Sequence, residues 1–167
     1  MKKNILALVL MFCISASGLY AQTMKTITRD SFSLKYPEKW KIDKEDPDYD
    51  PDALFSIDAP DEQNMIMFFI FNTVLDTDEM LSEQIKALSE SLLKNPEITD
   101  FTDWGKYKGK GKILKGKFLG AYKGYIRLFF YADDHKSMLV MEQVYDSIKD
   151  DVKADLKAII DSFTFKK

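Results

Sequence analysis

The chain has 167 residues, of which 46% are hydrophobic and 31% charged, and its 24 basic and 27 acidic residues give a formal net charge of −3. This composition excludes a low-complexity or disordered chain, because it supplies enough apolar surface to bury a core. The acidic balance argues against nucleic acid as a partner, since domains that bind it carry a clustered excess of Lys and Arg.

The first 21 residues have the three-part pattern of a secretory signal peptide. Lys2 and Lys3 precede an apolar run from Ile5 to Ala16, and small and turn residues follow up to Ala21. This run of about 12 residues is shorter than the roughly 20 that a membrane-spanning helix requires. We therefore expect residues 1–21 to be cleaved, which leaves no transmembrane anchor and places the protein in the periplasm or outside the cell.

The mature chain, residues 22–167, has a length typical of a single domain. Loss of Lys2 and Lys3 leaves 22 basic and 27 acidic residues, a net charge of −5. The single cysteine, Cys13, lies within the predicted signal. The mature domain is therefore expected to have no disulfide and no cysteine-ligated metal, so that its stability must come from its core.

The stretch FSLKYPEKW, residues 32–40, predicts an amphipathic strand that ends at a proline. Phe32, Leu34 and Tyr36 alternate with polar residues, as in a strand with one buried face. Pro37 has no N–H for ladder pairing, and Trp40 then returns apolar surface to the core. We interpret the motif as a core edge, with a ligand-stacking role for Trp40 as the alternative.

The next elements are two strands and a helix. Strands are expected over 53–58 and 64–74, and the second contains seven consecutive apolar residues, MIMFFIF, which is typical of a central strand covered on both faces. Asp76 followed by Glu79 predicts a helix start, and apolar residues at helical spacing continue to the stop signal Asn95-Pro96.

Residues 98–146 predict a mainly antiparallel meander. Its strands are expected over 98–104, 118–122, 125–132 and 138–145, with a turn at 133–137. A final helix is expected from Ser147. The lysines between 106 and 117 change from even to odd positions after Lys112, which predicts a bulge or a turn. The predicted fold is α+β: a three-layer α/β/α sandwich with a mainly antiparallel sheet covered by one helix on each face.

This order of elements, together with FSLKYPEKW, Leu119-Gly120-Ala121-Tyr122 and the closing DSFTF of residues 161–165, resembles the PsbP-like superfamily, named for an extrinsic subunit of the oxygen-evolving photosystem. Bacterial secreted proteins and lipoproteins are similar, as is a eukaryotic import factor that binds the Ran GTPase. The resemblance spans residues 25–167 and rests on fold markers. It implies a non-enzymatic accessory or binding module and carries over no functional residue.

The acidic stretch DPDYDPD is the first candidate site. It places Asp46, Asp48, Asp50 and Asp52 at every second position, where their oxygens could converge on calcium if the loop curls. EF-hand spacing is not met, because Pro51 and Ile57 occupy the positions of the required Gly and Glu. A solvated loop, a cation site and a protein contact all stay open.

The basic stretch KYKGKGKILKGK is the second candidate site, with six lysines in twelve residues. On one strand, alternate residues share a face, so its first four lysines would form a positive ridge for an anionic partner. These residues are Lys106, Lys108, Lys110 and Lys112. The alternative is a sheet edge whose lysines prevent association with other edges.

No grouping predicts an enzyme. His135 is the only histidine, and neither a nucleophile elbow nor a phosphate-binding loop is present in the sequence. A hydrolase with a carboxylate pair drawn from Asp58, Asp61 and Glu62 is a minor alternative. We expect a non-enzymatic extracytoplasmic binding or accessory protein with no cofactor, whose partner is another envelope or secreted protein. A protein that binds calcium or a small anionic ligand is the alternative.

Overall fold

The computed structural model describes residues 23–166, and the predicted signal peptide, 1–21, lies outside this range. Two helices are described, α2 (Thr77–Ser91) and α3 (Asp150–Ser162). The strands are β1 (Met24–Thr28), β2 (Phe32–Pro37), β3 (Lys41–Asp43), β4 (Leu54–Asp58), β5 (Met65–Phe71), β6 (Glu97–Trp104), β7 (Tyr107–Phe118), β8 (Tyr122–Ala132), β9 (Ser137–Tyr145) and β10 (Thr164–Phe165). No helix among these residues is long and apolar enough to cross a membrane.

Seven of the strands form one sheet in the order β3-β4-β5-β9-β8-β7-β6, with antiparallel pairing throughout. The run MIMFFIF is β5, a central strand as predicted. Ile66 and Phe68 belong to the core on one face of the sheet, whereas Met65 and Met67 pack against the core on the other. A strand without polar alternation thus has apolar neighbours on both sides.

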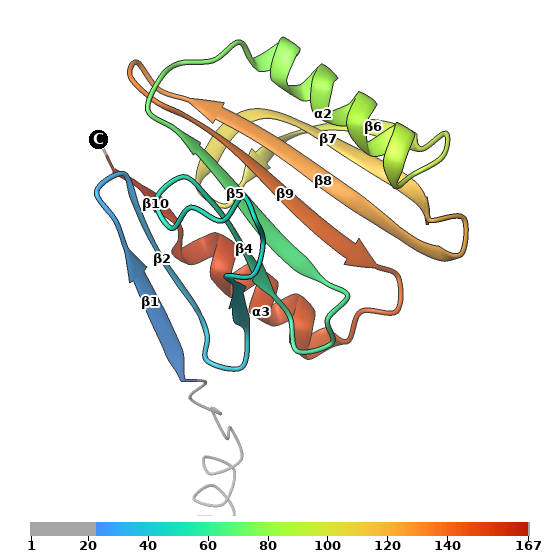
Figure 1. The fold of residues 1–167 in the computed structure, drawn as a ribbon, viewed down its shortest axis with the longest axis horizontal. Coiled ribbons are helices and arrows are strands. Elements are labelled where there is room, and N and C mark those ends of the chain that lie inside the picture. Colours follow the sequence, from blue (N-terminus) through green and yellow to red (C-terminus); the bar gives the residue numbers. More distant parts are fainter. Residues whose placement is uncertain (1–22, 167) are drawn as a thin grey trace, which may run out of the picture.

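The two helices pack on opposite faces of this sheet (Figure 1). Helix α2 lies over β7 and β8, with Leu81 buried, and Asp76 caps it by accepting a hydrogen bond from the Glu79 N–H, as the sequence predicts. Helix α3 contributes Val152, Leu156 and Ile159 to the other core. The expected cap at Ser147 is wrong, because the helix begins at Asp150 after Lys149.

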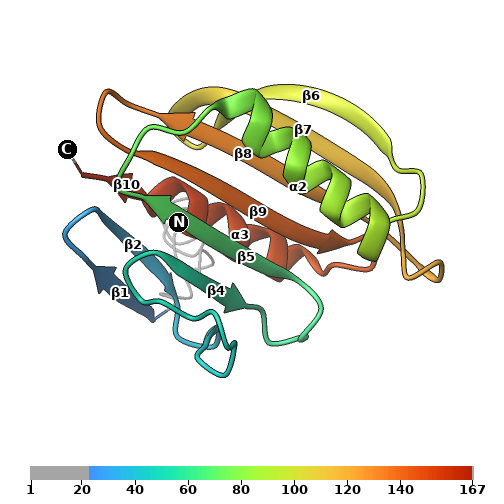
Figure 2. The ribbon, with the colours of Figure 1, turned by 45° about the horizontal axis from the view of Figure 1, so that its top comes forward.

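The expectation of a single sheet requires a correction. Strand β2 pairs with β1 and β10 in a separate three-stranded sheet that lies on the α3 side of the molecule (Figures 1 and 2). The apolar face of β2 is buried against α3, so this strand covers the large sheet instead of extending it. The layer on that side is therefore a helix together with a small sheet.

The FSLKYPEKW motif is a core edge, as predicted. Phe32, Leu34 and Trp40 are 0–1% exposed. The Trp40 Nε1–H donates to Asp155 Oδ2 of α3 at 2.9 Å, and Lys39 Nζ lies 2.8 Å from the same oxygen. The motif therefore fastens the end of β2 to the final helix, and the buried Asp155 has both an indole N–H and an ammonium beside it.

The meander is present, with two differences from expectation. The strand predicted at 118–122 is instead a hairpin turn, in which Leu119 and Gly120 have φ angles of 48° and 77°. The pairing of β7 with β8 is unbroken from Lys110 to Phe118, so no bulge follows Lys112. The change of lysine parity instead reflects a change of sheet face along a regular strand. Odd-numbered Gly111 faces Phe101 in the α3 core, whereas even-numbered Leu114 lies in the α2 core, so lysines at even and odd positions lie on opposite faces.

A register shift does occur on the other side of β7, between Phe101 and Asp103 of β6. Phe101 and Trp104 are three residues apart and would face opposite sides of a regular strand. The shift allows both rings to pack against the same aromatic core.

Candidate functional site

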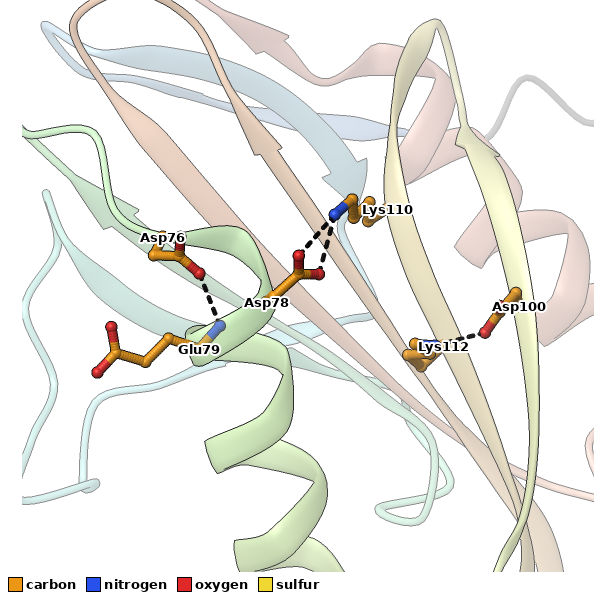
Figure 3. Close-up of polar contacts among 6 residues, drawn as sticks. All are labelled: Asp76, Asp78, Glu79, Asp100, Lys110 and Lys112. Carbon is orange, nitrogen blue, oxygen red and sulfur yellow. Dashed lines mark hydrogen bonds and ion pairs between the residues drawn. The ribbon is translucent and has the colours of Figure 1, made fainter.

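Two lysines of β7 form ion pairs with carboxylates of the same chain (Figure 3). Lys110 Nζ lies 2.9 Å from both carboxylate oxygens of Asp78 in α2, and Lys112 Nζ lies 2.6 Å from Asp100 Oδ1 in β6. An ion pair within the molecule reduces the field that a distant anion experiences. The lysine stretch is therefore a weaker positive surface than its sequence suggests.

The pairing register places further carboxylates opposite the lysines of β7 and accounts for the Lys112–Asp100 ion pair. Strand β6 is acidic, and its carboxylates stand opposite lysines of β7 in the pairs Glu97–Lys115, Asp100–Lys112 and Asp103–Lys108. Opposite charges in directly facing positions stabilise a sheet modestly. Strand β6 forms the outer edge of the sheet, so the alternative that these lysines guard an edge does not describe β7.

The four candidate lysines do not form one row. Lys108, Lys110 and Lys112 lie on the face of β7 that carries α2, but Lys106 lies in the turn before β7. Its Nζ donates to Thr164 Oγ1 at 2.8 Å and lies 5.6 Å from the centre of the Tyr107 ring. Whether this surface binds an anionic partner stays a prediction.

The acidic loop uses its side chains to shape the backbone. Asp46 Oδ1 accepts the Asp48 N–H and Asp50 Oδ1 accepts the Asp52 N–H, both as short-range turns. Asp52 Oδ1 also lies 3.0 Å from Arg29 Nε. Within residues 23–166, no three His, Cys, Asp or Glu side chains are grouped to hold a metal ion. The calcium interpretation stays an untested alternative.

A cleft of about 530 Å³ lies at the β3–β5 end of the large sheet. Two cross-strand rows run across it, and both lie on the face of the sheet that carries α2, because Met67 and Met141 pack in the α2 core. The rows are Lys41–Asp58–Met65–Gln143 and Asp43–Ser56–Met67–Met141. Helix α2 lies over β7 and β8 and does not extend over β4 and β5 (Figure 2). The β4–β5 part of this face is therefore not covered by the helix.

The cleft, which we call the acidic cleft, has an uneven distribution of charge. Its lining holds four carboxylates, Asp43, Asp46, Asp58 and Glu62, and one basic residue, Lys41. Met65 and Met67 supply an apolar floor. Asp46 is the one member of the predicted acidic loop set that lines the cleft.

Asp58 is a partly buried carboxylate of the acidic cleft with a perturbed pKa. Its Oδ1 is buried and has no hydrogen-bond partner among the described residues. Burial raises the pKa of Asp58, the nearby Asp43 carboxylate acts in the same direction, and the Ser56 hydroxyl opposes them. An ionised acceptor without a donor is costly when buried, so a cation or hydrogen-bond donor placed beside Asp58 would stabilise it.

The three carboxylates considered for a hydrolase have different tasks. Asp58 and Glu62 line the acidic cleft, but Asp61 accepts the N–H groups of Gln63 and Asn64 and the Asn64 side-chain amide. Burial alone would raise the pKa of Asp61, but these three hydrogen bonds outweigh it and lower the pKa. Asp61 is thus a turn-forming carboxylate. His135 also lies at a hairpin turn, with its N–H donating to Asp133.

Sequence reasoning did not find the acidic cleft, because its residues come from four strands and two loops. Asp43 and Lys41 carry no motif, and their position beside Asp58 follows only from the pairing of β3 with β4. The alternation of β4 was a usable signal: Ser56 and Asp58 alternate with Phe55 and Ile57, which indicates one polar face.

No protein-family model and no curated protein matches the chain by sequence. Its structure is similar to that of the cyanobacterial PsbP protein CyanoP from Synechocystis sp. PCC 6803, with a TM-score of 0.52, 10% identity and coverage of 91% of this chain and 98% of that one. The chain has the PsbP-like fold. The resemblance noted in the sequence is therefore confirmed at the level of fold.

Two further solved structures share this fold. The Saccharomyces cerevisiae Ran-binding protein Mog1p has a TM-score of 0.53 and 11% identity, with 87% of this chain and 96% of that one covered. A Bacteroides thetaiotaomicron protein has a TM-score of 0.52 and 13% identity. The match covers 86% of this chain and 48% of the Bacteroides chain, about half of its length. At these identities the comparison establishes the architecture and not the activity.

Proposed function

We propose that residues 22–167 act outside the cytoplasm as a single-domain, non-enzymatic binding protein, after removal of residues 1–21 as a signal peptide. The partner is another envelope or secreted protein. It docks over the acidic cleft and inserts a basic side chain. This role keeps the accessory or binding function that the sequence suggests, but it differs from the pocket-poor surface expected for such a protein, because the contact lies at a cleft.

The observation that carries this proposal is the composition of the acidic cleft. A Lys or Arg side chain has a charged end and an apolar stem, and the cleft offers carboxylates at its walls and Met65 and Met67 at its floor. Methionine adapts its shape to apolar partners. The volume of about 530 Å³ lies within the range of binding pockets, and it exceeds what one side chain fills, so that neighbouring partner atoms can enter as well.

Two considerations support a protein as the partner. The acidic cleft lies on strands β3–β5, whereas α2 packs on β7 and β8, so the charged lining is accessible to a protein surface, and protein interfaces commonly have a polar rim. Mog1p is a Ran-binding protein, which indicates that this fold can serve protein binding.

The proposal can be tested by affinity capture from envelope and culture fractions of the source organism at low and high salt. The bait is residues 22–167, compared with Asp46→Asn/Glu62→Gln, which removes two charges from the acidic cleft. The matched control is Glu83→Gln/Glu90→Gln, which removes two charges from the exposed side of α2. We expect one protein to bind wild type and control but not the cleft variant, and to dissociate in high salt.

The captured protein then allows a direct measurement. Titration calorimetry with the purified partner should give an affinity for the cleft variant that is weaker by about tenfold or more, which corresponds to the loss of two favourable charge contacts. Equal binding to all three baits would place the contact elsewhere on the surface. Failure of all baits to retain any protein at either salt concentration would overturn a protein partner.

A further inference from the structure

A second cavity lies on the opposite face of the large sheet from the acidic cleft. It is a groove of about 450 Å³ between α3 and strands β8 and β9. We call it the α3 groove. Its sheet side is formed by Tyr125, Arg127 and Glu142, and its helix side includes Lys153 and Lys157. Three basic residues and two acidic ones, Glu142 and Asp161, line it, so its balance of charge is opposite to that of the acidic cleft.

Glu142 is an unusual residue for its place in the sheet. On β9 it continues the row of Met138, Val140 and Val144, which belong to the apolar core beneath α3. Glu142 is 2% exposed. Its Oε1 accepts the Trp104 Nε1–H at 2.7 Å, and Arg127 Nη1 lies 3.2 and 3.1 Å from its two oxygens. A buried carboxylate of this kind requires such partners, and one result is that Arg127 is held in a fixed position.

Arg127 is held on a second side by an aromatic ring. Its guanidinium carbon lies 4.5 Å from the centre of the Phe101 ring, within the range of a cation–π contact. All of its hydrogen bonds to residues 23–166 use Nη1, so Nε and Nη2 donate to none of them. Its side chain is 25% exposed and lines the groove. The free Nε–Nη2 edge is therefore a prepositioned pair of donors.

The rest of the groove supplies further groups for the same kind of ligand. Lys153 and Lys157 are four residues apart and so lie one turn apart on the same side of α3. Each has a surface carboxylate partner, Asp150 at 3.2 Å and Asp161 at 2.5 Å, and such exposed pairs are weak enough to rearrange. The Tyr125 hydroxyl makes no hydrogen bond within the described range. Burial raises the pKa of Tyr125, and the nearby Glu142 charge acts in the same direction. It therefore remains a neutral donor.

We propose that the α3 groove binds a small oxyanion, a carboxylate or a phosphate, through the Nε–Nη2 edge of Arg127. Two parallel N–H···O bonds from a guanidinium match the geometry of either group. The site is completed by Lys153 and Lys157 of α3 and by the hydroxyl of Tyr125, which lies two residues before Arg127 on β8. The Glu142 carboxylate is on the Nη1 side of the guanidinium, where it orients Arg127.

The two tryptophans provide an internal probe for this binding. Trp104 shares Glu142 with Arg127, whereas Trp40 bonds to Asp155 through its own indole N–H. In a proton–nitrogen correlation spectrum, each indole N–H gives a separate signal. We expect titration with inorganic phosphate, sulfate or acetate, at ionic strength held constant with chloride, to shift the Trp104 signal saturably and leave the Trp40 signal in place.

Two variants and one control identify the groups involved. Arg127→Lys keeps the charge beside Glu142 but removes the fork, and should weaken binding of the tightest of the three anions by about tenfold or more. Lys153→Gln/Lys157→Gln alters only the exposed rim and should weaken it about threefold to tenfold. Lys86→Gln, on exposed α2, should bind as wild type does. The cleft variant Asp46→Asn/Glu62→Gln should also keep anion binding, which separates this site from the proposed protein contact.

Several results would overturn the proposal. The first is the absence of a saturable Trp104 shift with all three anions, and the second is parallel movement of both indole signals, which indicates general screening. Binding that is unchanged in the rim variant would also contradict it. The Trp40 signal reports whether Arg127→Lys folds. If it does not fold, the affinity of Lys153→Gln/Lys157→Gln for the anion tests the proposal instead.

Discussion

The two faces of the large sheet are built from the same strands but are covered in different ways. On the α3 face, aromatic rings stack in series: the ring centres of Phe55 and Phe68 lie 5.0 Å apart, and those of Phe68 and Phe163 lie 5.2 Å apart. On the α2 face, the core is mainly aliphatic and Met-containing, and α2 covers only part of it. One face is closed by a helix and a small sheet, and the other remains open at β3–β5.

This difference predicts that the two faces contribute unequally to stability. The closed face buries large rings, which contribute most to folding per residue, and its charged residues are held in networks such as Trp104–Glu142–Arg127. The open face exposes carboxylates and lysines whose ion pairs contribute little to stability. Substitutions on the α3 face should therefore change unfolding strongly, and those at the open end of the α2 face should change it weakly.

The largest effect is expected from Phe163→Ala. Phe163 is fully buried and contacts the rings of Phe32, Phe68 and Trp104. Its truncation should lower the free energy of unfolding in urea by about 4 kcal/mol. Leu81→Ala, at the centre of the α2 contact, should cost about 2 to 3 kcal/mol. An equal or larger loss for Leu81→Ala would contradict the proposed division between the faces.

The next effect concerns the buried ion pair of the α3 face. Arg127→Leu leaves the Glu142 carboxylate buried with only Trp104 as a donor, and should cost about 3 kcal/mol. Arg127→Leu/Glu142→Leu removes both charges and should be less destabilised than the single variant. A double-mutant cycle in urea measures this difference, and additive losses would show that the two side chains do not depend on each other.

The secondary structure of both faces follows largely from periodicity in the sequence. The run MIMFFIF predicts β5, and Asp76 with Glu79 predicts the start of α2, because strand burial and helix capping depend on local residues. The three-stranded sheet could not be predicted. Its outer strands, MKTIT and TF, are short and without a clear pattern. Their pairing with β2 depends on tertiary contacts and not on their local sequence.

The candidate sites show a similar limit. Composition reveals the lysine stretch and the acidic loop, but the ion pairs depend on contacts that no local pattern specifies. Lys110 meets Asp78 across the sheet–helix interface, and Lys112 meets Asp100 through strand register. Glu142 could have been noticed in the sequence, because it follows directly on the apolar run MLVM of β9. A charged residue at a core position indicates that it has a partner of opposite charge.

The acidic cleft should show a stabilising substitution of moderate size. Asp58→Asn removes a charge whose Oδ1 is buried without a donor, and should raise the free energy of unfolding at neutral pH by about 1 kcal/mol. Because the pKa of Asp58 is raised in the folded state, wild type loses stability as pH rises from the ordinary pKa to the raised one. The advantage of Asp58→Asn should therefore grow over this window and vanish below it.

Asp61→Asn is the matched control for the sign of this effect. The pKa of Asp61 is lowered in the folded state, where its hydrogen bonds to Asn64 and Gln63 outweigh burial. Its carboxylate therefore contributes stability above its ordinary pKa that is lost as pH falls through the lowered value. Asp61→Asn should destabilise the protein at neutral pH and converge with wild type in strong acid. The same trend for both variants in urea titrations over pH would refute the assignment.

A smaller effect is expected from the lysines of β7. Lys110→Gln breaks an exposed pair with Asp78 and should cost about 0.5 kcal/mol or less, decreasing with added salt. Lys108 is exposed and forms no ion pair with residues 23–166, so Lys108→Gln should change stability even less. Thermal melts at low and high salt measure both. A salt-insensitive loss above about 1 kcal/mol for Lys110→Gln would indicate a packing role for its stem.

The smallest effect is expected from calcium. Asp46 and Asp50 use side-chain oxygens in backbone turns, and Asp52 lies beside Arg29, so calcium would compete with these interactions for the same carboxylates. A ligand that binds only the folded protein raises the melting temperature. We expect millimolar calcium to leave it unchanged relative to sodium chloride of equal ionic strength. A saturable rise that is lost in Asp48→Asn/Asp50→Asn would instead mean that the loop rearranges around the ion and that its carboxylates, and not the Asx turns, determine its conformation in calcium.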